Sequence, residues 1–251
     1  MEFAGKAILV TGSTRGIGAA AAELFLERGG SVVLHGRHQA TVDAAAARLS
    51  TRHPGRVRGL AADLADRAQC RSFAKKVSAL DILVNCGGIF REAPISETSL
   101  AMWDETIAVN LTASWVLSRE LLPVLRQRTG TIVNVGSDAA MLGYAGCVAY
   151  CASKGAIVGL TRALATEAAP HIRVLCVCPG PTETDMMQES VAATPDEAQA
   201  RKQWASYTLL GRVAAPREIG EAIVLAASPR ATFMTGSIIM ADGGATAGRR
   251  V

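Results

Sequence analysis

Two side chains in the C-terminal half of the sequence have the types and the spacing needed to move a proton. Tyr150 and Lys154 are four residues apart, so in a helix they lie on one face, about one turn apart. The ordinary pKa of tyrosine, about 10, is too high for a base near neutrality. A nearby ammonium favours the phenolate and lowers that pKa. Tyr150 is therefore a candidate acid/base that exchanges a proton with a substrate oxygen while a hydride moves at the adjoining carbon.

Two further polar residues fall where they can assist this pair. Ser137 comes just after the strand predicted at 131–135, where its hydroxyl can hydrogen-bond the same substrate oxygen. Asn110 interrupts a long predicted helix; we expect it to bend the helix and hold a water beside Lys154. Each residue alone also fits an ordinary role, such as a helix N-cap for Ser137 or a local backbone bond for Asn110. Their combination with Tyr150 favours catalysis.

A glycine-rich turn connects the first predicted strand, 7–10, to the helix that follows it. Glycines permit a tight turn and a close approach of the backbone to a pyrophosphate. The helix N-terminus then offers N–H groups and a positive dipole end to the phosphates. The spacing is G-x-x-x-G-x-G, and a plain strand–helix corner is the alternative interpretation. The expected phosphate contacts are Gly12, Ser13, Thr14, Arg15, Gly16, Ile17 and Gly18.

The end of the second predicted strand indicates which nicotinamide cofactor fits. A carboxylate there would bind the adenosine ribose and repel a 2′-phosphate, but His35-Gly36-Arg37-His38 contains no acid. Arg37 can meet a 2′-phosphate, and Arg15 can approach it from the other side. The sequence therefore favours NADP(H) over NAD(H); the alternative is that Arg37 is a solvated surface residue.

These residues must be positioned by alternating strands and helices. Short apolar strands separated by longer helical patterns predict right-handed βαβ units and a parallel sheet. Residues 181–214 form a long connection after Pro179-Gly180, which predicts a substrate lid. We predict strands at 7–10, 31–34, 57–60, 82–85, 131–135, 173–178 and 237–240, and helices near 16–29, 39–50, 64–79, 99–128, 148–168 and 215–227.

Composition narrows the class of protein. The 251 residues, 49% hydrophobic and 19% charged, predict one α/β domain over 1–251 with a large core. The net charge of +4 comes from interspersed charges, so we expect neither a nucleic-acid nor a membrane partner. With no signal peptide and no membrane-spanning apolar run, we expect a cytoplasmic protein. The six cysteines are predicted to be free thiols, and we expect no metal site.

Together these motifs resemble the short-chain dehydrogenase/reductase family of about 250 residues, over essentially the whole chain. The matching segments are Thr11-Gly12-x-x-x-Gly16-Ile17-Gly18, Asp63-Leu64, Asn85-Cys86-Gly87-Gly88, the tetrad Asn110, Ser137, Tyr150 and Lys154, Pro179-Gly180 with Thr184, and Asp242-Gly243-Gly244.

The resemblance implies a Rossmann-type doubly wound α/β fold whose seven-stranded parallel sheet has the order 3-2-1-4-5-6-7, flanked by helices. It implies a homotetramer or dimer built on the helices that carry Asn110 and Tyr150, and a role for Lys154 in binding the nicotinamide ribose. The cofactor contacts that it adds are Asp63, Leu64, Asn85, Gly87, Tyr150, Lys154, Pro179, Gly180, Thr182 and Thr184.

The leading hypothesis is an NADP(H)-dependent oxidoreductase that interconverts a small-molecule carbonyl and a secondary alcohol, acting on CH–OH donors. By motif, 3-oxoacyl-(acyl-carrier-protein) reductases are the most similar members, so a β-ketoacyl-thioester reductase is the alternative. Arg126 and Arg128 are candidates for a carrier-protein contact, but Ala168-Ala169-Pro170-His171 lacks an arginine expected nearby. A non-catalytic cofactor-binding regulator is disfavoured, because such proteins lose the tyrosine or lysine that are both present here. Candidate polar contacts to substrate are Arg91, Asp138 and Tyr144.

Overall fold

The computed structural model describes residues 1–248 and contains one sheet of seven parallel strands. Residues 249–251 of the predicted domain lie outside the described residues. The strand order β3-β2-β1-β4-β5-β6-β7 confirms the predicted order. The strands are β1 (Ala7–Val10), β2 (Ser31–Gly36), β3 (Val57–Ala61), β4 (Ile82–Asn85), β5 (Thr131–Val135), β6 (Arg173–Pro179) and β7 (Ile238–Ala241).

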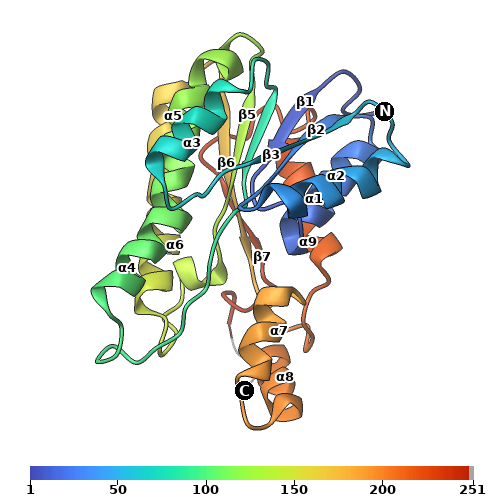
Figure 1. Cartoon of the computed structure of the whole chain (residues 1–251). Helices are drawn as coiled ribbons and strands as arrows, with labels where there is room; N and C mark the ends of the chain where they lie inside the picture. The colour runs from blue at the N-terminus through green and yellow to red at the C-terminus, as the bar shows by residue number, and fades with distance from the viewer. Residues whose placement is uncertain (249–251) are drawn as a thin grey trace.

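Helices cover both faces of this sheet, as Figure 1 shows. The first, second and last helices lie on one face, and the third to sixth on the other, while the seventh and eighth lie beyond the carboxyl ends of the strands. The helices are α1 (Gly16–Glu27), α2 (Gln39–Ser50), α3 (Arg67–Lys75), α4 (Leu100–Ile107), α5 (Ala113–Arg126), α6 (Val148–Ala168), α7 (Asp185–Ala192), α8 (Glu197–Ser206) and α9 (Pro216–Ala227).

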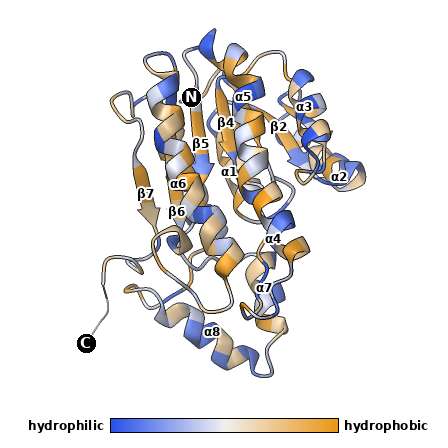
Figure 2. Ribbon diagram, turned by 90° about the vertical axis from the view of Figure 1, so that its left-hand side faces the viewer, coloured by the Kyte–Doolittle hydropathy of each residue, from blue (hydrophilic) through white to orange (hydrophobic). Residues whose placement is uncertain are grey.

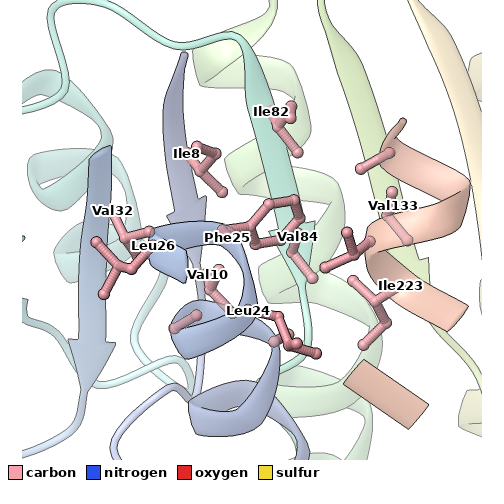
Figure 3. Packing of buried hydrophobic residues seen from close by; sticks show 14 of the residues in the cluster. Ile8, Val10, Leu24, Phe25, Leu26, Val32, Ile82, Val84, Val133 and Ile223 are labelled. Carbon is pink, nitrogen blue, oxygen red and sulfur yellow. The ribbon is translucent and has the colours of Figure 1, made fainter. Parts of the chain in front are cut away.

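The strands are apolar along their length because both of their faces are buried. In β1, Ile8 and Val10 pack in a cluster with α1 and α9, whereas Leu9 packs in the cluster on the other face with α3 and α5. Figure 3 shows Phe25 of α1 and Ile223 of α9 packed against the first of these faces. In Figure 2 the strands are mainly orange, and the outer helices carry blue segments. The core therefore consists of two apolar layers that fix the strand ends in space.

Two parts of the chain differ in detail from the sequence prediction. The helix predicted at 99–128 is divided: α4 and α5 are joined by a π-helical turn over Ala108–Thr112. This turn surrounds Asn110, the residue predicted to bend the helix, and such turns are a known cause of helix bends. The predicted lid at 181–214 contains α7 and α8, and the side chains of Thr184 and Asp196 cap their N-termini.

Three further properties bear on function. Within residues 1–248, no helix is both long and apolar enough to cross a membrane. The same residues contain no cluster of three or more His, Cys, Asp or Glu side chains arranged to hold a metal ion. All six cysteines are free, and four of them are buried.

Candidate active site

A cavity of about 990 Å³ opens at the carboxyl edge of the sheet. Its walls come from the segments that follow the first six strands, β1 to β6, and α7 and α8 cover one side of it. In doubly wound sheets, ligands bind in the crevice where the strand order reverses, here between β1 and β4. The cavity lies at that crevice.

The glycine-rich turn forms the floor of the cavity between β1 and α1. Gly12 has a φ of +62°, and a Cβ there would lie 2.7 Å from the Cα of Gly87 in the turn after β4. The Thr11 hydroxyl accepts hydrogen bonds from the backbone N–H groups of Cys86 and Gly87, at 2.9 and 2.8 Å. The two turns are thus held together, with the N-terminus of α1 directed at the cavity. A dinucleotide pyrophosphate fits this arrangement, because close backbone and free helical N–H groups are what it binds.

Ser13 occupies a different place from the one predicted. Its side chain is buried; the hydroxyl donates to the carbonyl of Val10 at 2.8 Å and accepts from the N–H of His35 at 2.9 Å. Its own N–H donates to the carbonyl of His35 at 2.9 Å. Since its donors are used in joining β1 to β2, Ser13 shapes the turn rather than facing the cavity.

His35 supports the same turn from the end of β2. Its Nδ1 accepts a hydrogen bond from the N–H of Gly12 at 3.1 Å, and its Nε2 lies 3.1 Å from the carbonyl of Ala62. These contacts fit a neutral ring with the proton on Nε2. Burial lowers the pKa of His35 from 6.5 to about 4. The imidazole is therefore uncharged at neutral pH, and its Nδ1 accepts the hydrogen bond that holds the backbone of Gly12 in place.

We expect this lowered pKa to make stability depend on pH. Because the folded-state pKa lies below the unfolded value, the stabilisation is complete above about pH 6.5 and is lost as the pH falls towards 4. The free energy of unfolding should fall by roughly 3 kcal/mol more over this range in the wild type than in His35→Asn. Asparagine keeps an acceptor near Nδ1 and does not titrate. Urea denaturation from pH 7 to 4.5 measures both slopes; equal slopes would contradict the assignment.

Two arginines line the cavity near the ends of β1 and β2. Arg37 follows β2, is exposed and lines the cavity; its Nε lies 3.2 Å from Nε2 of His38. Arg15 is paired differently from the expectation that it approaches the 2′-phosphate, since its Nη1 contacts Asp185 at 3.3 Å and Glu189 at 3.1 Å on α7. Within the described structure, Arg37 is therefore the better placed of the two for a cofactor phosphate.

Tyr150 and Lys154 lie in the first two turns of α6, where the sequence predicts them on one face. The Nζ of Lys154 is 5.7 Å from the centre of the Tyr150 ring and donates to the carbonyl of Val135 at 3.0 Å. Phe90 packs edge-on against the Tyr150 ring, with centroids 5.0 Å apart. This packing fixes the ring where the strand ends of β4 and β5 meet.

The electrostatics of the pair differ from the expected lowering of the tyrosine pKa. Burial raises the pKa of Tyr150 well above its usual range, the nearby Ser137 hydroxyl opposes the rise, and the charge of Asp138 adds to it. Burial also lowers the pKa of Lys154. Desolvation of the phenol thus dominates, and the raised pKa keeps Tyr150 a protonated phenol at neutral pH.

Ser137 follows β5 and stands beside a buried carboxylate. Its hydroxyl donates to Oδ1 of Asp138 at 2.9 Å and accepts from the N–H of Ala139 at 3.1 Å. The same Asp138 accepts from the Tyr144 hydroxyl at 2.8 Å. Burial raises the pKa of Asp138, while these donors oppose the rise. The sequence indicated Asp138 and Tyr144 as substrate contacts but did not predict their hydrogen bond to each other.

Asn110 lies behind the cavity wall rather than in it. The side chain is 2% exposed; its Oδ1 accepts from the N–H of Ile89 at 2.8 Å, and its Nδ2 donates to the carbonyl of Ile89 and to Ser153. A Cβ on Gly88 would lie 3.2 Å from Asn110 and 3.7 Å from Lys154. Asn110 therefore anchors the turn after β4 to α6, next to Lys154.

The remaining predicted cofactor contacts divide into two groups. Asn85 is buried, and its Nδ2 donates to Asn134 at 2.8 Å and to Ser118 at 3.2 Å inside the molecule, so its side chain does not line the cavity. The contacts that line the cavity are Gly12, Thr14, Arg15, Gly16, Ile17, Gly18, Arg37, Asp63, Leu64, Gly87, Tyr150, Lys154, Pro179, Gly180, Thr182 and Thr184.

Arg128, considered as a carrier-protein contact, lies at the opposite edge of the sheet. Its Nη1 pairs with the buried carboxylate of Asp81 at 3.3 Å, and Asp81 precedes β4 and also binds Lys6 at 3.1 Å. Arg128 is thus engaged in holding strand N-termini together, far from the carboxyl ends where the cavity opens. In the single chain, Arg128 therefore does not line the cavity, and a carrier-protein contact through this residue stays a prediction.

Comparison with known proteins places the whole chain among described oxidoreductases. A family model described as enoyl-(acyl carrier protein) reductase matches residues 12–246. The chain is 38% identical to 2-(S)-hydroxypropyl-CoM dehydrogenase 3 of Xanthobacter autotrophicus, covering 96% of this chain and 97% of that protein. It is 36% identical to a 3-oxoacyl-(acyl-carrier-protein) reductase of Vibrio harveyi, covering 97% and 98%.

Solved structures agree over the same length. A short chain dehydrogenase/reductase family protein superposes with a TM-score of 0.90 at 35% identity, covering 99% of this chain and 100% of that one. A protein of Beutenbergia cavernae, whose crystal structure contains NADP at low occupancy, also superposes with a TM-score of 0.90, at 34% identity and 98% coverage of both chains. The likeness therefore extends over the sheet, the cavity and residues 181–214.

Proposed function

This chain belongs to the short-chain dehydrogenase/reductase family and is an oxidoreductase, and from that premise we propose that it interconverts a carbonyl and a secondary alcohol with NADP(H). The observation that carries the proposal is the meeting of Tyr150, Lys154 and Ser137 in one cavity with the phosphate turn. An acid/base, a hydrogen-bond donor and a dinucleotide cradle at one sheet edge are the parts that hydride transfer to a carbonyl requires.

The cofactor, when bound, supplies or accepts the hydride at carbon. In the reducing direction Tyr150 donates its phenolic proton to the substrate oxygen as negative charge develops there. Because burial raises the pKa of Tyr150, the phenol holds at neutral pH the proton that it donates in this direction. Ser137 rotates its hydroxyl from Asp138 to the same oxygen. Lys154 carries positive charge beneath the phenol, and Asn110 holds the adjoining turn.

The preference for NADP(H) is the finer part of the proposal. It is supported by Arg37 on the cavity wall, by the lack of an acid in residues 35–38, and by NADP in the related Beutenbergia cavernae structure. A neutral His35, rather than a carboxylate, occupies the end of β2. A 2′-phosphate therefore meets a guanidinium and no negative side chain from residues 35–38.

A carbonyl panel assayed by NADPH consumption tests the function. We expect uncharged ketones to be reduced with NADPH and the rate with NADH to be lower. A 3-oxoacyl thioester, such as an acetoacetyl thioester, is the second candidate, favoured by the identity to the Vibrio harveyi reductase. Turnover of the thioester above all simple ketones would select that candidate. No turnover of any carbonyl with either cofactor would reject both.

A homotetramer or dimer in the cytoplasm completes the proposal. Its support is the exposed apolar surface of the helices expected at the interface. Trp103 of α4, Trp115 of α5 and Val148 of α6 are among the large apolar side chains that remain solvent-exposed in the single chain. Large apolar surface left exposed on a folded chain is commonly a contact surface.

A further inference from the structure

The cavity wall beside Ser137 contains a buried carboxylate that hydride transfer does not use. Asp138 is 6% exposed and lines the cavity. Its Oδ1 accepts from the Ala139 N–H at 2.8 Å and from Ser137 at 2.9 Å, and its Oδ2 accepts from Tyr144 at 2.8 Å. A carboxylate offers about four lone-pair positions. Since these are its hydrogen bonds within residues 1–248, one acceptor position on Oδ2 remains for a ligand. A second position, on Oδ1, opens when Ser137 turns its hydroxyl to the reacting oxygen.

The partners of Asp138 are all neutral, although burial of a charge is costly without a cation or a full set of donors. Arg91, which also lines the cavity, is already paired, since its Nε lies 3.6 Å from Glu105. Within residues 1–248 no salt bridge reaches Asp138 itself. A substrate group that donates a hydrogen bond therefore fills the open acceptor position of the Asp138 carboxylate. An anionic substrate group is repelled by the same carboxylate.

We propose that Asp138, held by Tyr144, selects substrates that carry a hydroxyl or amino group close to the reacting carbon and rejects anionic ones. The inference rests on the proposed function, because it assumes that Ser137 contacts the reacting oxygen. Ser137 Oγ is 2.9 Å from the carboxylate, so the second polar group of the substrate lies near the carbon that exchanges hydride. Asp138 is a specificity-determining residue, and Tyr144 is a positioning residue that fixes its orientation.

A set of alcohols with one carbon frame tests this selection by NADPH formation from NADP⁺. Propylene glycol and isopropanolamine carry a donor next to the reacting carbon. The primary methyl ether of propylene glycol carries only an acceptor, lactate carries an anion, and secondary butanol carries neither. We expect kcat/KM for propylene glycol to exceed that for its methyl ether and for lactate by about 10- to 100-fold. The ratio of glycol to isopropanolamine shows which donor is preferred.

The variant Asp138→Asn replaces the hydrogen-bond acceptor Oδ2 with a donor and changes the shape of the side chain little. The amide keeps an oxygen for Ala139 and Ser137 and places an NH₂ donor where Oδ2 stood. We expect the ratio of glycol to methyl ether to fall by about 10- to 100-fold. Glu92→Gln removes the same charge from an exposed residue of the cavity rim. In that control variant we expect the ratio to stay near the wild-type value.

The outcomes separate this inference from the proposed function. Turnover of none of these alcohols, together with turnover of no carbonyl, defeats the proposed function itself. Oxidation of secondary butanol with an unchanged ratio in Asp138→Asn overturns the role of Asp138 alone. If that variant does not fold, the substrate preference of the wild type tests the inference. A kcat/KM for propylene glycol no higher than that for its methyl ether overturns it, and so does lactate as the best substrate.

Discussion

Replacing Tyr150 with phenylalanine will lower kcat for carbonyl reduction by roughly 10²- to 10⁴-fold, the usual contribution of a positioned acid or base. Phenylalanine keeps the ring that packs edge-on against Phe90, so the fold and the cavity wall are preserved. Only the proton donor is removed. Steady-state rates with NADPH and a ketone from the panel measure the loss, and fluorescence titration of NADPH shows that cofactor binding is retained.

Tyr207→Phe is the matched control for this variant. It removes the same hydroxyl from the same cavity, but Tyr207 is an exposed residue that follows α8 and bonds only Gln203 through its hydroxyl among the described residues. We expect its kcat to remain close to that of the wild type. Loss of activity in both variants would indicate a general disturbance of the cavity. A Tyr150→Phe enzyme within a few-fold of wild type would refute the proton-transfer role.

The second large effect concerns the choice of cofactor. We expect Arg37→Asp to reduce kcat/KM for NADPH by roughly 10- to 100-fold, the loss expected for a hydrogen bond between charged groups. The new carboxylate also repels the 2′-phosphate and can bind the ribose hydroxyls of NADH. The ratio of kcat/KM values for the two cofactors should therefore invert or approach one. Initial rates with a single ketone and both cofactors measure it.

Arg48→Asp is the matched control for Arg37→Asp. Arg48 is exposed on α2 and does not line the cavity. Arg48→Asp alters the net charge by the same amount, and we expect it to leave the cofactor ratio nearly unchanged, because exposed charges are screened over about 10 Å at ordinary salt. If Arg37→Asp behaved like Arg48→Asp, the phosphate contact would have to come from another residue.

The features of the fold that depend on local pattern could be predicted from the sequence. Apolar strands between helical segments predict the parallel sheet. The resemblance to the family implied its strand order, which the structure confirms. The same order brings Ser137, which follows β5, and Tyr150 of α6 to one edge. The turn at Gly12 was predictable for a similar reason, since a strand, glycines and a helix in succession permit few geometries.

Contacts between distant segments could not be predicted in this way. Ser13 looks like a phosphate ligand in the sequence, yet its hydroxyl joins β1 to His35 of β2. Arg15 looks like a second cofactor cation, yet it binds acids of α7 that lie about 170 residues later. Such pairings depend on tertiary distances, which a motif does not contain. The hydrogen bonds from the turn after β4 to the Thr11 hydroxyl were not predicted, for the same reason. A threonine directly after the first strand was the one signal for them in the sequence.

The π-helical turn around Asn110 has a consequence for the phase of the helices that it joins. A π turn accommodates one residue more than an α turn, so α4 is rotated by about 100° relative to its direction in an uninterrupted helix. Removing a single residue from 108–112 would restore continuous winding and swing every side chain of α4 around the axis. In chimaeras assembled from related chains, a junction in this segment must therefore preserve the residue count as well as the asparagine.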